Sequence, residues 1–173
     1  MPSHIKIRDL AKISALTAFS IFLYSAENLI PKPLPYLRIG LSNAFILCIL
    51  YLYDLKTGII VSLLRTALGL FLTGLLFSPN LMFGLAGGLS STFFMWLFIR
   101  FFGNFFSFIG ISIIGAVFHN LSQILVARFI FIKSDAIFSL LPFLILWGCG
   151  TGAVTGIFAG LILNAIKKVE KSL

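Results

Sequence analysis

Apolar runs long enough to cross a lipid bilayer take up most of this 173-residue chain. A membrane-spanning helix needs about 20 mostly apolar residues. Only 10% of the residues are charged, against about 25% in soluble domains, so the charges are too few to cover a soluble surface. The sequence therefore predicts an all-α polytopic membrane protein, a single domain over residues 1–173 with six transmembrane helices. We expect these helices at residues 10–26, 39–53, 57–77, 81–102, 107–132 and 136–166.

The connections between these runs predict the orientation, because Lys and Arg collect on the cytoplasmic side of membrane proteins. With the N-terminus inside, the outer side holds Lys32, Arg38 and Lys133, and the inner side holds Lys6, Arg8, Lys12, Lys56, Arg100, Lys167, Lys168 and Lys171. This bias predicts a multi-pass protein of the plasma membrane with both termini in the cytoplasm. Residues 27–38, which contain three alternating prolines, then form a stiff extended loop on the outer side.

A few strongly polar residues lie inside the apolar runs. Arg65 is near the middle of the third run, and His119, Asn120 and Gln123 lie together on the fifth. A charged side chain at the bilayer centre costs from about 2.5 to more than 10 kcal/mol, so such residues tend to face a bundle interior or a cavity. Two interpretations stay open for these side chains, hydrogen bonds between helices and the lining of a ligand cavity. Under the second, we expect Arg38 and Asn43 at the entrance.

Small residues recur every four positions on two of the runs. Gly148, Gly152, Gly156 and Gly160 share one face of the last run, and Ala11 and Ala15 share a face of the first. Small faces let membrane helices approach closely. Such a face either packs inside the bundle or docks a partner protein, and we expect Ala11, Ala15, Gly152 and Gly156 as docking residues under the second alternative.

The sequence lacks the motifs of several function classes. It has no nucleophile elbow, no zinc-protease motif and no phosphate-binding Walker loop, so we expect no enzyme activity and no ATP hydrolysis by this chain alone. Aspartate-rich runs that hold magnesium diphosphate are also missing, and we expect no metal and no cofactor. Although the net charge is +8, the cations are spread over helix ends and form no basic stripe, which argues against nucleic-acid binding.

One stretch resembles a known family. The run Glu27-Asn-Leu-Ile-Pro31, followed by Leu34-Pro-Tyr-Leu-Arg38-Ile-Gly-Leu-Ser-Asn43, resembles the start of the Gx transporter family, whose members are often labelled heptaprenyl diphosphate synthase component I. Arg65 and the run Gly115-Ala-Val-Phe-His119-Asn-Leu-Ser-Gln123 continue the match.

The resemblance implies a fold and a set of partners. The family's six-helix layout is similar to the S components of energy-coupling-factor transporters, which capture a vitamin or precursor from outside. In those transporters a transmembrane coupling subunit and two ATPases drive release. The run Ala11-Lys-Ile-Ser-Ala15 is similar to the alanine motif with which S components dock their coupling subunit.

We therefore expect a substrate-binding membrane subunit, with Arg65, His119, Asn120 and Gln123 around the ligand. The excess of cations and the 20 Phe residues favour an anionic or amphipathic small molecule, such as an isoprenoid, quinone or vitamin precursor. The alternative is a non-catalytic membrane accessory subunit of a heptaprenyl diphosphate synthase or of a membrane redox system.

Overall fold

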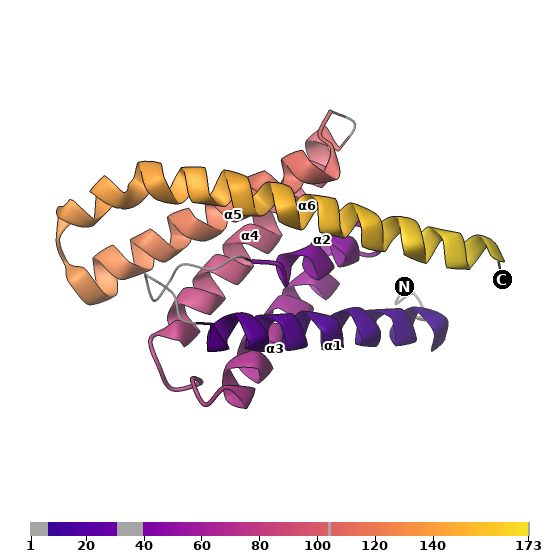
Figure 1. Cartoon of the computed structure of the whole chain (residues 1–173), viewed down its shortest axis with the longest axis horizontal. Helices are drawn as coiled ribbons and strands as arrows, with labels where there is room; N and C mark the ends of the chain where they lie inside the picture. Colours follow the sequence, from indigo (N-terminus) through magenta and orange to yellow (C-terminus); the bar gives the residue numbers. More distant parts are fainter. Residues whose placement is uncertain (1–6, 31–39, 104, 173) are drawn as a thin grey trace.

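The computed structural model describes residues 7–30, 40–103 and 105–172, the last three as backbone only, and no strand occurs among them. They form a helical bundle in which the two termini lie at the same end (Figure 1). Two short irregular helices, η1 and η2, link α5 to α6. The elements are α1 (Ile7–Leu29), α2 (Asn43–Leu52), α3 (Leu55–Leu72), α4 (Asn80–Phe102), α5 (Phe108–Val126), η1 (Ala127–Ile132), η2 (Asp135–Leu140) and α6 (Leu141–Ser172).

The all-helical prediction is confirmed for the described residues, but only four segments among them are both long and apolar enough to cross a membrane. Two of them are α3 and α4, and the other two are α5 continued by η1 and α6 preceded by η2. Helix α1 is 23 residues long but carries four charged residues. Helix α2 has 10 residues, about 15 Å at 1.5 Å per residue, which is half of a hydrocarbon core of about 30 Å.

Two predicted helix boundaries are wrong because glycines with positive φ interrupt the chain. Gly40 has φ 79°, and helix α2 begins only at Asn43 instead of residue 39. Gly74 has φ 71°, and helix α3 ends at Leu72 instead of residue 77. Glycine adopts such angles at little cost, whereas other residues seldom do. Apolar composition continues through both positions, so the pattern alone suggests longer helices.

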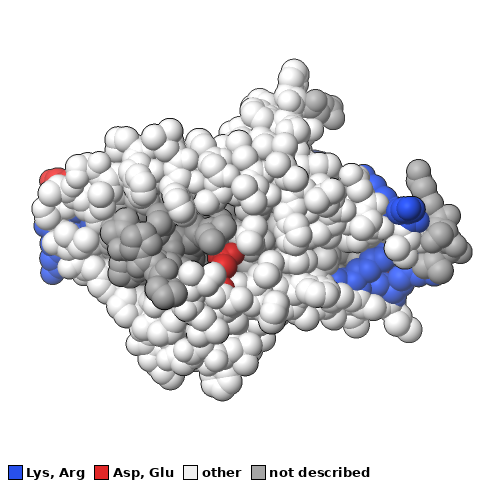
Figure 2. All heavy atoms as spheres, viewed as in Figure 1, with Lys and Arg blue, Asp and Glu red and all other residues white. Residues whose placement is uncertain are grey.

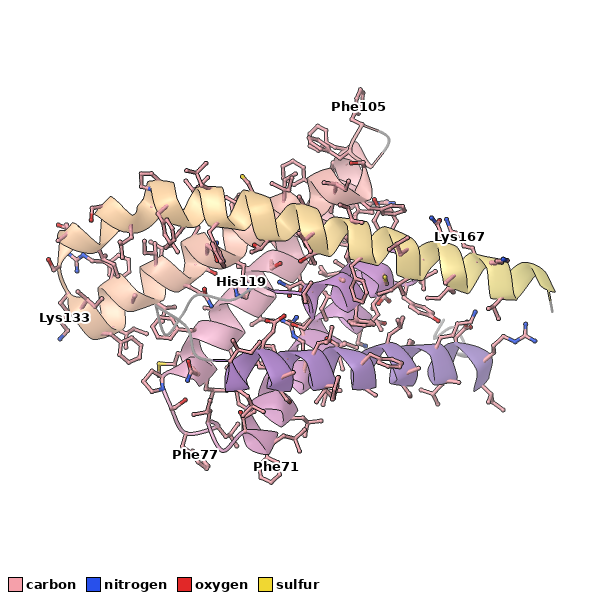
Figure 3. All side chains as sticks on the ribbon, in the orientation of Figure 1. Phe71, Phe77, Phe105, His119, Lys133 and Lys167 are labelled. Carbon is pink, nitrogen blue, oxygen red and sulfur yellow. The ribbon has the colours of Figure 1, made fainter. Side chains whose placement is uncertain are left out.

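Helix α2 lies in the centre of the bundle. All of its residues from Asn43 to Leu50 are buried, as expected for a helix that is apolar all round. Around it pack α1, α3, α4 and α6. Many large apolar side chains are exposed, including Phe71 on α3 and, in the turns before α4 and α5, Phe77 and Phe105 (Figure 3). The bundle thus has a dry inner helix and an outer surface suited to lipid.

The glycine face of α6 packs against α5 of the same chain. A Cβ atom added at Gly152 would lie 2.7 Å from the Cα of Ile113, and one added at Gly156 would lie 2.5 Å from the Cα of Ile109. Both distances are shorter than carbon atoms tolerate, so the two backbones meet there. The prediction that Gly152 and Gly156 dock a partner is therefore corrected, and their face belongs to the bundle interior.

Candidate functional site

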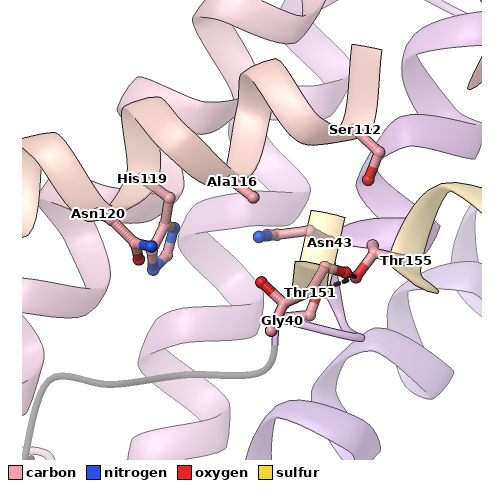
Figure 4. A pocket seen from close by; sticks show the side chains of 8 residues that line it. All are labelled: Gly40, Asn43, Ser112, Ala116, His119, Asn120, Thr151 and Thr155. Carbon is pink, nitrogen blue, oxygen red and sulfur yellow. Dashed lines mark hydrogen bonds between the residues drawn. The ribbon is translucent and has the colours of Figure 1, made fainter. Parts of the chain in front are cut away.

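A small, partly open cavity with mainly polar lining residues lies inside the bundle. Its volume is about 10 Å³, about the space that one water molecule needs. The segment before α2 and helices α2, α5 and α6 supply its walls (Figure 4). The lining consists of Gly40, Asn43, Ser112, Ala116, His119, Asn120, Thr151 and Thr155.

Three predicted site residues line this cavity: Asn43, His119 and Asn120. Both α5 residues are buried, with 5% and 6% of their surfaces exposed. His119 fits because α4 has glycine opposite it: a Cβ atom at Gly87 would come within 2.6–2.8 Å of three ring atoms. Asn120 donates from Nδ2 to the carbonyl oxygen of Leu144 at 2.8 Å, so it joins α5 to α6 while its own carbonyl oxygen remains able to accept.

Arg65 lies behind the cavity and does not line it. Its side chain on α3 is 1% exposed. Nη1 donates to Asn43 Oδ1 at 2.6 Å and to Ser42 Oγ at 3.2 Å, and the guanidinium carbon lies 5.2 Å from the centre of the Tyr24 ring. The prediction of Arg65 as a ligand contact is thus revised: Arg65 contacts Asn43, and Asn43 reaches the cavity.

The contact with Arg65 fixes how Asn43 presents its amide. An arginine side chain has only donors, so the atom of Asn43 that it meets must be the carbonyl oxygen. The amide nitrogen is then the atom of Asn43 that points into the cavity, as Figure 4 shows. Arg65 therefore places a hydrogen-bond donor in the cavity through a neutral side chain.

Helix α1 holds the segment before α2 from the other side. Glu27, expected in the loop, lies in the last turn of α1 and is 5% exposed. Its Oε2 accepts a hydrogen bond from the backbone N–H of Gly40 at 3.2 Å. Two turns earlier on α1, Ser20 Oγ donates to the carbonyl oxygen of Ser42 at 3.2 Å. The backbone that carries Gly40 and Asn43 is thus fixed by buried polar groups of α1.

Gln123, the fourth predicted cavity residue, is buried but lies outside the lining. Its Nε2 is 3.5 Å from the carbonyl oxygen of Phe83, so it links α5 to α4. Arg38 lies outside the described residues. Ala11 and Ala15 are exposed on α1, where a partner could reach them.

Sequence reasoning missed the hydroxyl groups of the site. Ser112 lies two helical turns before His119 on α5, so extending the His119 face backwards would have found it. Thr151 and Thr155 are four residues apart on α6, and each donates to a carbonyl oxygen one turn earlier, at 2.9 and 2.8 Å. Their oxygen atoms can therefore accept hydrogen bonds from a molecule in the cavity.

In the part of the chain that the structure describes, helices without strands and four apolar segments of membrane length are the features of integral membrane proteins. The family model of heptaprenyl diphosphate synthase component I matches residues 16–162, which is most of the chain. The chain belongs to this family, as the resemblance implied. No curated protein and no solved structure matches it.

Proposed function

We propose that this protein is a substrate-binding membrane subunit for uptake of a small molecule, similar to the S components of energy-coupling-factor transporters. The observation that carries the proposal is the small interior cavity where Asn43, His119 and Asn120 converge. Polar groups inside a membrane are costly and are retained where they bind something. A cavity of about 10 Å³ must widen to admit a vitamin-sized molecule.

The chemistry of the lining supports a ligand whose buried part has both donors and acceptors. The cavity offers a donor from Asn43, acceptors from Thr151 and Thr155, and an imidazole from His119. The apolar surroundings suit an aromatic or isoprenoid body, such as a quinone or vitamin precursor. An acidic group on that ligand would be stabilised by Arg65 at longer range.

We also propose that the chain is not a catalyst. The hydroxyls of Thr151 and Thr155 donate to main-chain carbonyl oxygens of their own helix, which leaves them poorly placed to lose a proton to a base. Energy for uptake would come from a transmembrane coupling subunit and ATPases, docked at Ala11 and Ala15. In this arrangement the protein lies in the plasma membrane and both of its termini face the cytoplasm.

A second candidate follows from the family description, which names a component of a heptaprenyl diphosphate synthase. The chain would then be a membrane accessory subunit of a soluble prenyl synthase. The exposed cations Arg8, Lys167 and Lys168, at the end of the bundle that holds both termini, would be its docking surface.

Native mass spectrometry of the protein purified gently from its own membranes tests these proposals. Uptake predicts co-purified ATPases and a second membrane subunit, or a retained small molecule that the Asn120→Ala and His119→Ala variants lose. The accessory role predicts a soluble prenyl synthase that both variants keep and that the Lys167→Glu/Lys168→Glu variant loses. A prenyl synthase without ATPases or small molecule would contradict the uptake proposal.

A further inference from the structure

An apolar groove runs along the outside of the bundle between α1 and α6, and none of its lining residues lines the polar cavity. Its volume is about 420 Å³. Helix α1 supplies one wall with Lys12, Ala15 and Phe19, and helix α6 supplies the other with Phe158 and Ile162. The floor is formed by Phe45 of α2. The Phe45 ring lies 6.0 Å from the rings of both Phe19 and Phe158, so an aromatic surface connects the two walls.

The groove ends among cations. Lys12 is a half-buried wall residue, and Lys167 and Lys168 follow directly after Ile166, the last α6 residue of the lining. Arg8 lies one turn before Lys12 on α1. Figure 2 shows blue surface at this end of the molecule, and Figure 3 places Lys167 there and Lys133 at the opposite end. Asp9 is the acidic residue of the same α1 turn.

We propose that this groove binds one acyl chain of an anionic phospholipid, whose phosphate lies against Lys12, Lys167 and Lys168. An acyl chain matches a lining that is apolar throughout and faces the bilayer. The phosphate matches the cationic end, because basic pockets between membrane helices recognise acidic head groups. A lysine in such a wall lays its methylene stem along the apolar surface and holds its ammonium group at head-group level.

A partner helix fits these features less well. An apolar helix in the groove would place its own backbone end beside three lysines. Its C-terminal carbonyl groups would offer them only a partial negative charge, less than the full charge of a phosphate. The lipid carries the anion and the apolar chain in one molecule. This inference goes beyond the proposed function, since it does not involve the polar cavity. The groove shares Ala15 with the face proposed to dock the coupling subunit, so a lipid there would have to leave before that subunit docks.

The test uses the full chain in detergent with equal amounts of dioleoyl-phosphatidylglycerol and dioleoyl-phosphatidylcholine, and counts bound lipids by native mass spectrometry. The two lipids share their chains and differ in head-group charge. We expect a preference for phosphatidylglycerol that falls about fivefold in Lys12→Gln and stays unchanged in Lys133→Gln, at the opposite end. Ala15→Leu, which fills the groove, should lower retention of both lipids, whereas Ala11→Leu, outside the lining, should not.

Equal retention of the two lipids by the unchanged chain would overturn the proposal, as would equal effects of Lys12→Gln and Lys133→Gln. All four positions are at or near the surface, so melting temperatures within a few degrees of the unchanged chain would confirm that the variants fold. A photoreactive group on Ala15→Cys in native membranes gives an independent answer. Lipid adducts support the inference, and adducts to protein alone overturn it in favour of a docked subunit.

Discussion

Two of the arginines in the membrane-length segments, Arg65 and Arg128, have opposite surroundings. Arg65 is 1% exposed and donates to two neutral oxygens, those of Ser42 and Asn43. The side chain of Arg128 is 23% exposed and pairs with Asp135, whose side chain is 77% exposed. Arg128 thus meets an acid near water, and Arg65 organises neutral side chains in the interior.

The difference shows which arginine matters for the fold and the site. An exposed ion pair contributes little, because water and salt screen it. Hydrogen bonds from a buried charge are stronger, and losing the charge leaves its buried partners unsatisfied. Arg65 also determines which atom Asn43 turns to the cavity, whereas Arg128 connects η1 to η2 at the rim of the bundle.

Replacing each arginine by alanine should give the largest difference in stability between the two regions. Arg65→Ala leaves the buried oxygens of Asn43 and Ser42 without their donor and should cost about 3 kcal/mol or more of stability. Arg128→Ala should cost no more than about 1 kcal/mol. Unfolding in a mild detergent titrated with SDS measures both, and similar losses would break the comparison.

Two glycines of α6 extend the comparison from charge to packing. A Cβ atom at Gly156 would lie 2.5 Å from the Cα of Ile109, whereas one at Gly150 would meet no atom within 4 Å. Gly156→Ala should therefore destabilise the bundle by about 1–3 kcal/mol through overpacking. Gly150→Ala should be neutral or slightly stabilising, since alanine favours a helix. The same SDS titration measures the free energy of unfolding of both variants. An unchanged value for Gly156→Ala would mean that α5 and α6 are not in close contact.

Much of this fold follows from the sequence, because apolar length and turn residues report helices directly. Six transmembrane helices were expected, and the described residues form six α-helices that give four segments long and apolar enough to cross a membrane. Errors lie at Gly40 and Gly74, where backbone conformation and not composition interrupts the helix. The short α2 could not be distinguished from a spanning helix, since burial by protein and burial by lipid select the same residues.

The site was predictable only in part. His119 and Asn120 stood out because polar residues are rare in that run, and both line the cavity. Arg65 stood out for the same reason, yet its distance from the cavity depends on how α2 and α3 pack, which no local pattern records. Thr151 and Thr155 were missed because a hydroxyl bonded to its own helix is common in membrane spans and gives a weak signal.

Asn43→Asp tests the proposed division of labour between Arg65 and Asn43. The new carboxylate keeps an oxygen for Arg65. The free energy of unfolding should therefore differ from that of the unchanged protein by less than about 1 kcal/mol, far less than the loss in Arg65→Ala. The cavity, however, exchanges an amide donor for an acceptor. We expect the folded variant to lose any small molecule that the unchanged protein retains in native mass spectrometry. Retention of that molecule would show that the Asn43 amide does not contact it.

The smallest effect should come from Asp54, at the exposed start of α3. Asp54 accepts a hydrogen bond from the N–H of Thr57 at 2.7 Å. Hydrogen bonding to the side chain of Thr57, and next to its backbone, lowers the pKa of the Asp54 carboxyl group. A lowered folded pKa stabilises the protein above the unfolded value of about 3.9, and this stabilisation disappears as the pH falls through the folded pKa.

Asp54→Ala should cost about 1 kcal/mol or less at pH 7, whereas Asp54→Ser, which still caps the helix, should recover most of it. The difference in melting temperature between Asp54→Ala and the unchanged chain should shrink below pH 4. If the difference persists there, the carboxylate charge is not its source, because the protonated side chain would then cap α3 as well as the ionised one.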